Sequence, residues 1–566
     1  MLTDMNLNDP FDTGLIMGID LGTTNSAVAV HTTGLVPKLC PMGVGKITMP
    51  SCVRWNGGDS FTVGEEAYNG RYNKDTKYSV KRQMGTDDKI RLTTEQGQSR
   101  LFTPVEISAE ILKELKKQAN EYYPGVRRAV ITVPAYFNQR QIEDTVTAAN
   151  MADIECVQIL KEPTSASYIY SMLGHAKGGR VLIYDLGGGT FDITHMSFLR
   201  KADIPSTVVT ALRKNFAIDL REELKDDSKL YYQEVLGTYG DTHLGGDDID
   251  SILADIVLRE AKVSMGHTAK EMLKLKCEQF KKCGFEGQDF TVDGHNLSVN
   301  KAMLKEATDI IFARTMEIIK KIPEEDIEEI STIVLVGGST KSQFIVDALS
   351  RTFPSKEISR VLDPDTTVAL GAGAVAKDLA HGKAPAYNDV LPMAIGVLKD
   401  GAEVEVCVPS NTAMPHVVHR IYRTMHDNQE AISVDVFQGI STNPSECTFL
   451  GKLRIDGIPP KPAGEVEIGI TFMLNAQGRL KVTTRVDDVN EERELIVESL
   501  FDVSSERKVA LYDDIGEPAD EFEEQLWDLI PKNPTIRDFI LSRRAAIAEN
   551  DDSAVDRIES ELWEIL

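Results

Sequence analysis

The chain has 566 residues, of which 42% are hydrophobic, and it carries a formal net charge of −26. This length allows about three or four domains with packed cores, and the negative charge argues against binding to nucleic acid or to an anionic membrane surface. The seven cysteines form no Cys-x-x-Cys pair, so we expect a reducing compartment without disulfides or structural zinc. Residues 1–13 are polar and acidic, and no apolar run approaches the roughly 18 residues of a membrane span. We therefore predict a cytoplasmic protein.

Two short motifs with nearly the same sequence lie about one domain apart. Residues 20–25 read DLGTTN and residues 185–190 read DLGGGT, and each motif follows one apolar run and precedes another. This pattern predicts a strand, a tight glycine turn and a returning strand. The backbone N–H groups and threonine hydroxyls of such turns can bind an anion, and the leading Asp can hold a hydrated cation. One hairpin alone would carry no function, whereas two predict a duplicated fold that binds one polyphosphate from both sides.

Up to residue 379, apolar runs typical of buried strands alternate with amphipathic runs typical of helices, which is an α/β pattern. We predict strands at 130–133, 181–184 and 333–336, and helices at 104–121, 139–151 and 300–321. A third glycine motif, Gly337-Gly338-Ser339, follows the last of these strands. Two phosphate hairpins followed by such a turn are the order expected of the actin-like (ribonuclease H-like) ATPase fold, whose last turn lies against the nucleoside.

After a short Gly- and Pro-containing break at 381–388, the pattern of the chain changes. Apolar residues then alternate strictly with polar ones, at 404, 406 and 408, at 432, 434 and 436, at 466–472, and at 480 and 482. This alternation, with turn residues between the runs, predicts an antiparallel β-sandwich. Amphipathic stripes over 536–540 and 555–565 predict a short α-helical C-terminal segment.

Together these motifs resemble the DnaK family of 70-kilodalton heat-shock chaperones. The matching segments are 17–30, 80–85, 130–138, 160–164, 181–193, 240–250, 333–341, 362–373, 424–429, 436–439 and 456–460. The short acidic end and Thr424-Met425-His426 are most similar to HscC-type members, which have a reduced lid. The resemblance implies a nucleotide-binding domain over 15–380 with an extra segment at about 200–233, a linker over 381–388, a β-sandwich substrate-binding domain over 389–500 and a helical lid over 501–566.

The resemblance implies an ATP-dependent chaperone that binds unfolded or apolar peptide segments and hydrolyses ATP slowly. Its cofactors would be ATP or ADP, Mg²⁺ and K⁺, and its partner a J-domain co-chaperone. Lys81 would reach the γ-phosphate and the attacking water, and Glu162 would help to place that water. Asp185 and Thr190 complete the catalytic set that the resemblance implies.

The same resemblance implies the ligands of the cations and of the nucleotide. Asp20 and Asp185 would hold the hydrated Mg²⁺, and Asp192 a monovalent cation beside it. Because Lys282 and Lys341 stand where the family usually has Arg, which stacks better on a purine, we expect adenine binding to persist but to be weaker. The implied nucleotide contacts are Gly22, Thr23, Thr24, Asn25, Gly187, Gly188, Gly189, Gly245, Gly246, Glu278, Lys281, Lys282, Gly337, Gly338, Ser339, Lys341 and Asp365.

In the β-domain the resemblance implies a peptide-binding groove. Its lining would be Val397, Tyr422, Met425, Ile432, Val434 and Ile468. Alternation alone does not separate such a groove from the core of a sandwich. A flexible Met425 suits varied apolar side chains, and Asp400 at the opposite rim would disfavour acidic peptides.

Several positions that serve communication between domains depart from the family pattern. The linker lacks the usual run of leucines, and Ile142 and Gln158 stand where the family has Arg. A nucleotide-gated binding or scaffold protein with weakened coupling is therefore the alternative to a chaperone. A sugar or glycerol kinase on the same ATPase fold is disfavoured, because it would need no alternating β-domain. The extra segment at about 200–233 is either a surface elaboration or a partner-docking element.

Overall fold

The computed structural model of the chain describes residues 14–200, 232–486, 492–497 and 543, apart from positions 33, 35, 72, 384, 400, 401, 476, 477 and 479. The chain divides into two compact units, and the first, which ends at Ile496, contains the elements below. The predicted extra segment, the predicted helical lid and Asp400 lie wholly or almost wholly outside the described residues. Among the helices that the structure describes, none is long and apolar enough to cross a membrane.

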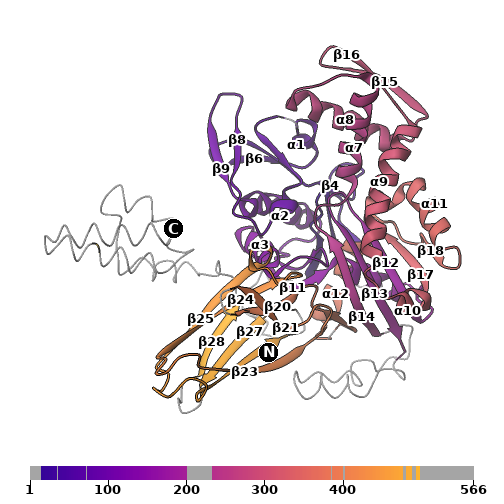
Figure 1. Cartoon of the computed structure of the whole chain (residues 1–566). Coiled ribbons are helices and arrows are strands. Elements are labelled where there is room, and N and C mark those ends of the chain that lie inside the picture. The colour runs from indigo at the N-terminus through magenta and orange to yellow at the C-terminus, as the bar shows by residue number, and fades with distance from the viewer. Residues whose placement is uncertain are drawn as a thin grey trace. The chain divides into compact units, whose positions relative to one another are not determined.

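The first sheet is built around the DLGTTN hairpin (Figure 1). β1 (Ile16–Asp20) runs antiparallel to β2 (Asn25–Val30) and parallel to β10 (Arg128–Val133). The strand order is β11-β10-β1-β2-β3, with β4 beside β2. The outer strands are β3 (Lys38–Leu39), β4 (Met49–Pro50) and β11 (Glu155–Lys161).

The second sheet repeats this arrangement around the DLGGGT hairpin. β12 (Gly179–Leu186) runs antiparallel to β13 (Phe191–Leu199) and parallel to β17 (Ile330–Val336). The strand order begins β18-β17-β12-β13-β14, with β14 at Tyr232–Asp241 and β18 at Glu357–Ser359. The predicted pair of hairpins in a duplicated α/β fold is therefore confirmed.

Two helices join the sheets. α12 (Thr367–Ala380) packs on β1 and β2, α4 (Glu162–Met172) packs on β12 and β13, and the two helices pack on each other. Glycine makes this approach close, since a Cβ on Gly371 would lie 1.9 Å from the carbonyl oxygen of Ser165 in α4. Below, lobe I means the first sheet with the helices and strands of residues 52–151, and lobe II means the second sheet with the helices and hairpin of residues 246–352.

Lobe I contains two long helices with clear start signals. α2 (Pro104–Tyr122) and α3 (Gln139–Met151) each begin with a capping box, from Thr103 and Asn138 respectively, which satisfies the free N–H groups of a first helical turn. Both helices match the sequence prediction to within one residue. The other elements are β5 (Cys52–Gly57), β6 (Ser60–Val63), α1 (Glu65–Asn69), β7 (Thr76–Tyr78), a 3-10 helix (Val80–Gln83), β8 (Ile90–Thr93) and β9 (Ser99–Phe102).

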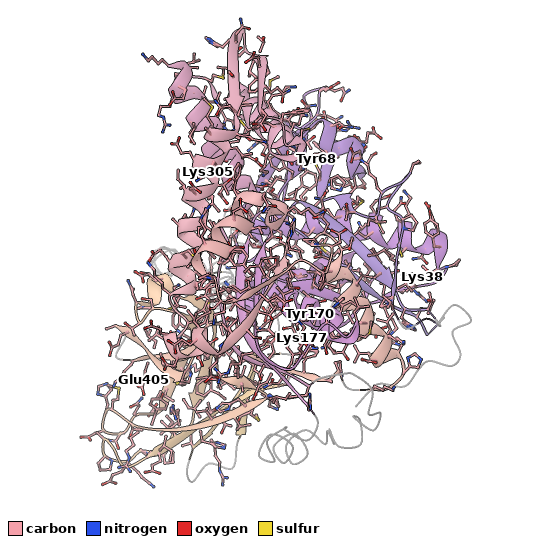
Figure 2. The ribbon with its side chains drawn as sticks, turned by 90° about the vertical axis from the view of Figure 1, so that its right-hand side faces the viewer. Lys38, Tyr68, Tyr170, Lys177, Lys305 and Glu405 are labelled. Carbon is pink, nitrogen blue, oxygen red and sulfur yellow. The ribbon has the colours of Figure 1, made fainter. Side chains whose placement is uncertain are left out.

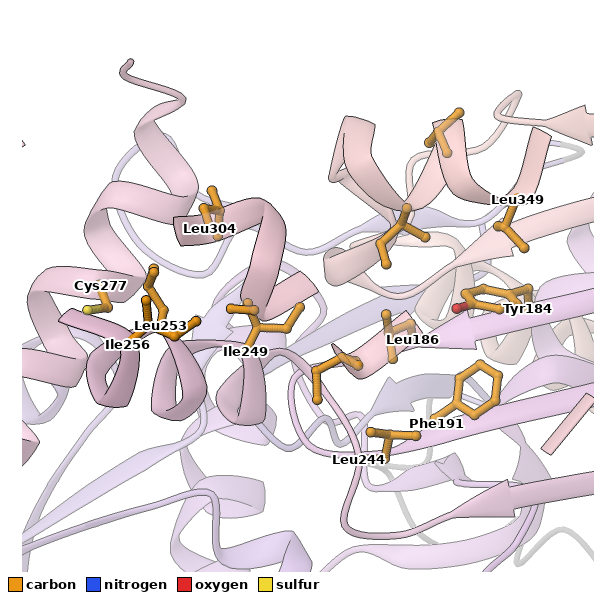
Figure 3. Packing of buried hydrophobic residues seen from close by; sticks show 14 of the residues in the cluster. Tyr184, Leu186, Phe191, Leu244, Ile249, Leu253, Ile256, Cys277, Leu304 and Leu349 are labelled. Atoms are coloured by element: carbon orange, nitrogen blue, oxygen red, sulfur yellow. The ribbon is translucent and has the colours of Figure 1, made fainter. Parts of the chain in front are cut away.

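The core of lobe II lies between its sheet and its helices (Figure 3). Tyr184 and Phe191 from the hairpin are fully buried, and α7 presents Ile249, Leu253 and Ile256 to the same core. The spacing of these three residues places them on one helical face. The helices and flanking hairpin are α7 (Gly246–Ala261), α8 (His267–Cys283), β15 (Gly287–Val292), β16 (His295–Asn300), α9 (Lys301–Ile319), α10 (Glu324–Glu329), a 3-10 helix (Gly338–Lys341) and α11 (Gln343–Thr352).

The β-domain consists of two four-stranded antiparallel sheets, as the alternation predicts. The predicted alternation at 404, 406 and 408 is wrong at its centre, because Val406 is exposed and Cys407 is buried. The register of the strand pair shifts between Ile395 and Gly396, which leaves one extra residue in the opposite strand. The sheets are β21-β20-β24-β25 and β23-β26-β27-β28, with bounds β20 (Ala394–Lys399), β21 (Glu403–Val408), β23 (His416–Arg423), β24 (Ala431–Gly439), β25 (Thr448–Asp456), β26 (Glu467–Leu474), β27 (Leu480–Val486) and β28 (Glu492–Val497).

A short strand connects the β-domain with the second sheet. β19 (Tyr387–Val390) follows the break after α12 and pairs in parallel with the start of β14. β22 (Ala413–Met414) pairs with β19 on its other side. The sheet that carries the DLGGGT hairpin therefore continues, strand by strand, to the β-domain.

The helix contact at Gly371 can be tested by substitution. We expect Gly371→Ala to lower the free energy of unfolding by about 1–3 kcal/mol, because the added methyl group overlaps backbone atoms of α4. This loss exceeds the helix propensity gained, which is about 1 kcal/mol or less. Gly34→Ala is the control, since a Cβ there meets nothing closer than 3.7 Å. Denaturant unfolding measures both variants, and equal stabilities would contradict the prediction.

Candidate functional site

A cavity of about 810 Å³ lies between lobe I and lobe II. This volume is typical of small-molecule sites, which span roughly 300–1,000 Å³. Both DLG hairpins and the Gly337-Gly338-Ser339 turn line the cavity, so the fold brings the three glycine motifs to one place. The sequence-predicted residues that line it are Asp20, Gly22, Thr23, Thr24, Asn25, Lys81, Glu162, Asp185, Gly187, Gly188, Thr190, Gly246, Glu278, Lys281, Lys282, Gly337, Gly338, Ser339, Lys341 and Asp365.

Three predicted residues, Asp192, Gly189 and Gly245, are not part of this lining. Asp192 lies on β13 directly opposite Asp185, is buried, and accepts a hydrogen bond of 3.1 Å from the backbone N–H of Tyr136. Gly245 permits a close approach of two chain segments, because a Cβ there would lie 2.6 Å from backbone atoms of Gly188. These residues therefore stand behind the cavity wall and shape it.

Buried carboxyl groups gather where the two hairpins meet. Burial, followed by the charge of Glu162, raises the pKa of Asp20 to about 7 and that of Asp192 to about 7. The same two causes raise the pKa of Asp185 well above its usual range. Such a group of carboxyls, held by the fold at the end of two strands, favours the binding of a cation.

The carboxyl groups suit a hydrated cation better than a directly coordinated one. No cluster of three or more His, Cys, Asp or Glu side chains in the described part of the chain has the geometry to coordinate a metal ion directly. Mg²⁺ usually keeps several water ligands and is held by one or two carboxylates together with substrate phosphates. The buried Asp192 also has one carboxylate oxygen, Oδ2, without a hydrogen-bond partner within the described residues. The residues present therefore fit Mg²⁺.

A buried ion pair stands beside these carboxyl groups. The ammonium of Lys81 donates to Glu162 Oε1 at 2.5 Å and to the carbonyl oxygen of Leu21 at 2.5 Å. Lys81 comes from the 3-10 helix of lobe I, and Glu162 is the first residue of α4. The next residue, Arg82, donates to the carbonyl oxygen of Gly189 at 2.9 Å. The 3-10 helix thus places one positively charged side chain against each hairpin turn.

The second hairpin is also fixed to the helices of lobe II. The carbonyl oxygen of Gly187 accepts from Ser339 Oγ at 2.8 Å and from the N–H of Gly246 at 3.0 Å. Lys281 of α8 donates to the carbonyl oxygen of Gly246 at 2.8 Å and to Asp250 Oδ2 at 2.7 Å. These contacts tie the DLGGGT turn to the third glycine motif and to α7.

Sequence reasoning missed several residues of the cavity. Asp247 and Asp250 of α7 both line it, and Asp247 Oδ2 accepts from Ser79 Oγ of lobe I at 2.7 Å. The sequence contains a signal for this part of the site, because a Gly-Gly-Asp-Asp run where a helix begins indicates an ordered turn with polar groups. The apolar residues Phe285 and Phe344 also line the cavity. They carry no motif, and only the fold brings them to the cavity.

Glu278 connects the two lobes at the edge of the cavity. It accepts from the hydroxyl of Tyr68 at 2.6 Å, from Arg71, and from Lys282 at 2.5 Å. Figure 2 labels Tyr68. Burial alone would raise the pKa of Glu278, but Lys282, Tyr68 and Arg71 hold it below the usual value. Glu278 therefore remains an anion that holds lobe I and lobe II together.

The predicted groove residues of the β-domain come from both of its sheets. Val397, Val434 and Ile468 are buried, and Met425 is 63% exposed. The hydroxyl of Tyr422 lies 3.5 Å from Cys407 Sγ, at hydrogen-bond distance. In this conformation, therefore, three of the six predicted lining residues lie in the core of the sandwich.

Comparisons with known proteins found a matching family model and a relative. The family model described as Hsp70 protein matches residues 16–202 and 231–562. Residues 203–230, which fall within the predicted extra segment, remain unmatched. A relative described as chaperone protein DnaK, from Thermosipho melanesiensis, is 32% identical over 542 residues, which cover 90% of this chain and 84% of the relative.

The pKa values generate a prediction for pH dependence. In the folded, cation-free protein, Asp20 and Asp192 keep their protons to about pH 7, whereas an Asp in the unfolded chain loses its proton near about pH 3.9. The folded state therefore binds more protons in this range, and its stability falls as the pH rises from about 4 to 7. A bound cation takes the place of these protons, so we expect stabilisation by Mg²⁺ with ADP to grow with pH.

Thermal unfolding with and without Mg²⁺ and ADP, at about pH 5.5 and about pH 7.5, measures this effect. Asp20→Asn serves as the control, because it removes one titrating group and should flatten the pH dependence of the cation-free protein. An equal thermal shift at both pH values would contradict the prediction.

Proposed function

This chain belongs to the Hsp70 family and is an ATP-hydrolysing chaperone that binds unfolded polypeptides, and we propose that its ATP occupies the cavity between lobe I and lobe II. One observation carries the proposal: three glycine turns and the Lys81–Glu162 ion pair surround a single cavity. The family uses ATP or ADP with Mg²⁺. The assignment of individual residues below is our own.

The two hairpins would hold the phosphates from opposite sides. Residues 22–25 of the first turn and Gly188 and Thr190 of the second line the cavity, and their backbone N–H groups, with the hydroxyls of Thr23 and Thr190, would donate to the phosphates. Thr24 Oγ1 is buried without a hydrogen-bond partner among the described residues, although it lines the cavity. Such a group is costly to bury unpaired, and a phosphate oxygen would satisfy it.

Asp20 and Asp185 would hold the hydrated Mg²⁺, and Asp192 a K⁺ ion nearby. When bound, the divalent ion supplies charge neutralisation on the phosphates. The three carboxyl groups would orient its water ligands and would lose their protons on binding. The unpartnered Oδ2 of Asp192 supports its assignment to a cation.

Lys81, Glu162 and Thr190 would position the reactants. The Lys81 ammonium would donate to the oxygens of the γ-phosphoryl group, where charge accumulates during transfer. The Glu162 carboxylate would accept a hydrogen bond from the attacking water and so align it. Their mutual hydrogen bond of 2.5 Å fixes both groups before a ligand enters. Preorganisation of this kind lowers the reorganisation needed in the transition state.

Contacts with β19 would carry the signal to the β-domain. Lys161, the neighbour of Glu162, donates to Asp389 at 3.1 Å and to the carbonyl oxygen of Val390 at 2.5 Å. Gln158 donates to the hydroxyl of Tyr387. Glu162, which we assign to catalysis, is thus adjacent in the sequence to Lys161, which holds β19. The unusual Gln158 and Tyr387 contact each other, which supports retained coupling over a scaffold with weakened coupling.

The β-domain also contacts both lobes. Gln438 Oε1 accepts from the N–H of Gln139 in lobe I at 2.8 Å, and Asn411 Oδ1 accepts from the N–H of Thr238 in lobe II at 3.0 Å. A rotation of one lobe against the other would strain one of these contacts. We infer that nucleotide-dependent movement of the lobes opens and closes the peptide site by this route.

We further propose that the apolar peptide site is the groove named from the sequence, closed by a short helical lid over 501–566 as in HscC-type members. Membership of the family supports a J-domain co-chaperone as a partner, and we also propose a cytoplasmic location and a docking or surface role for the segment at about 200–233. Gln158, which departs from the family pattern, is engaged by Tyr387. J-domain docking is therefore expected to differ in its detailed contacts.

The catalytic assignment predicts the effect of removing the ammonium. We expect Lys81→Ala to slow single-turnover ATP hydrolysis by roughly 100-fold or more, as for other lost electrostatic contacts in a transition state, while ATP still binds. Lys46→Ala is a matched control, because Lys46 is half-exposed and pairs with Glu65 on the surface. Rapid-quench measurements at saturating ATP decide the question, and an unchanged rate in Lys81→Ala would refute the assignment.

The coupling assignment predicts the effect of removing one hydroxyl. In the full chain, we expect Tyr387→Phe to reduce the acceleration by ATP of the release of a fluorescent apolar peptide. Gln158→Ala should do the same, and the double variant should add little, because both changes remove one contact. Tyr122→Phe, at an exposed tyrosine, is the control.

Stopped-flow release rates with and without ATP measure the coupling. An ATP effect of wild-type size in Tyr387→Phe would contradict the role of this contact. If ATP does not change the rate at which the wild-type chain releases the peptide, the scaffold function is favoured instead.

A further inference from the structure

One exposed aromatic side chain in the wall of the cavity has no role so far. α8 ends at Cys283 and is capped by Gly284, whose φ of +68° gives the left-handed conformation that often ends a helix. The next residue, Phe285, lines the cavity and is nevertheless 53% exposed. The other Phe and Tyr residues of this lobe that the structure describes are buried or partly buried, so an exposed phenyl ring at the wall of a cavity indicates a surface that a ligand can cover.

The two lysines expected beside the base are both engaged by carboxylates. Lys282 pairs with Glu278 at 2.5 Å, and Lys341 pairs with Asp363 at 3.2 Å and with Asp365. A compact, hydrated ammonium stacks poorly on an aromatic base even when it is free. Neither lysine therefore supplies the flat surface that a purine needs.

The neighbouring polar side chain that could contact the edge of a base is engaged too. Gln343 lines the same cavity. Its Nε2 donates to Asp347 Oδ1 at 2.7 Å, and its Oε1 accepts from Arg360 at 3.3 Å. Phe285 follows Lys282 by three residues and has the more exposed ring of the two phenylalanines in the lining, because Phe344 packs against the core of lobe II.

We propose that Phe285 stacks on the nucleobase of the bound nucleotide and supplies the affinity that the two lysines do not. The proposal rests on the proposed function, because it requires the nucleotide in this cavity. Stacking of a base on an aromatic ring contributes a substantial share of affinity and needs no hydrogen bond to the base. The ring should therefore raise the affinity for ligands that carry a base and leave the affinity for ligands with phosphates alone unchanged.

Isothermal titration of the full chain with Mg²⁺·ADP and with Mg²⁺·pyrophosphate separates base from phosphate. We expect Phe285→Ala to weaken ADP binding by roughly 5- to 150-fold, the range measured when a base loses its aromatic partner. Pyrophosphate binding should stay unchanged. Met272→Ala is the matched control, because Met272 is an exposed apolar residue of α8 that does not line the cavity.

A second variant gives a direct signal. In Phe285→Trp, we expect the added fluorescence to change on addition of ADP and not on addition of pyrophosphate. Single-turnover hydrolysis of Phe285→Ala at saturating ATP should keep its rate constant, because stacking on the base contributes to binding and takes no part in the transfer of the γ-phosphoryl group.

The outcomes separate the two proposals. If the wild-type chain binds neither ADP nor pyrophosphate, the nucleotide site itself is wrong. If it binds both, but Phe285→Ala binds ADP as tightly as the wild type or loses pyrophosphate to the same extent, the site stands and the stacking role is overturned. An unresponsive Phe285→Trp would also overturn it.

Discussion

The arrangement of this site depends on one electrostatic constraint: several carboxyl groups are buried together around the ammonium of Lys81. Asp20, Asp185 and Glu162 come from three different elements and meet because two like hairpins face each other. Burial, followed by the charge of Glu162, raises the pKa values of the two aspartates, and the charge of Lys81 offsets only part of this rise. The folded chain therefore disfavours the charged form of these aspartates until a cation takes the place of their protons, and ligand binding and the relation between the lobes become linked.

Much of this site was predictable from the sequence, because backbone geometry at glycine turns is a local property. DLGTTN, DLGGGT and Gly337-Gly338-Ser339 predicted the hairpins and the third turn, and the fold places all three at one cavity. Phe285 was not predictable, since its relation to the cavity depends on how α8 packs. Val406 was misassigned for a similar reason: a slip in register depends on the neighbouring strand, which no local pattern records.

Chain order explains why Glu162, to which we assign a catalytic role, lies beside the residue that holds β19. Lys161 ends β11 and Glu162 begins α4, so adjacent side chains diverge, one toward β19 and one toward the hairpins. A strand that passes directly into a helix leaves little freedom between them. A shift of the Glu162 carboxylate when nucleotide binds is therefore expected to reach Lys161 through a single peptide unit.

The contact of Gln438 with the first N–H of α3 has a consequence for the balance of states. The free N–H groups in the first turn of a helix can donate hydrogen bonds either to protein groups or to water. If the β-domain were to leave lobe I, water could replace the Gln438 carbonyl at Gln139, so this contact alone would cost little, about 0.5–1.5 kcal/mol for a typical hydrogen bond. Where docked and undocked forms are close in energy, a modest preference of nucleotide for one of them suffices to shift most molecules between them.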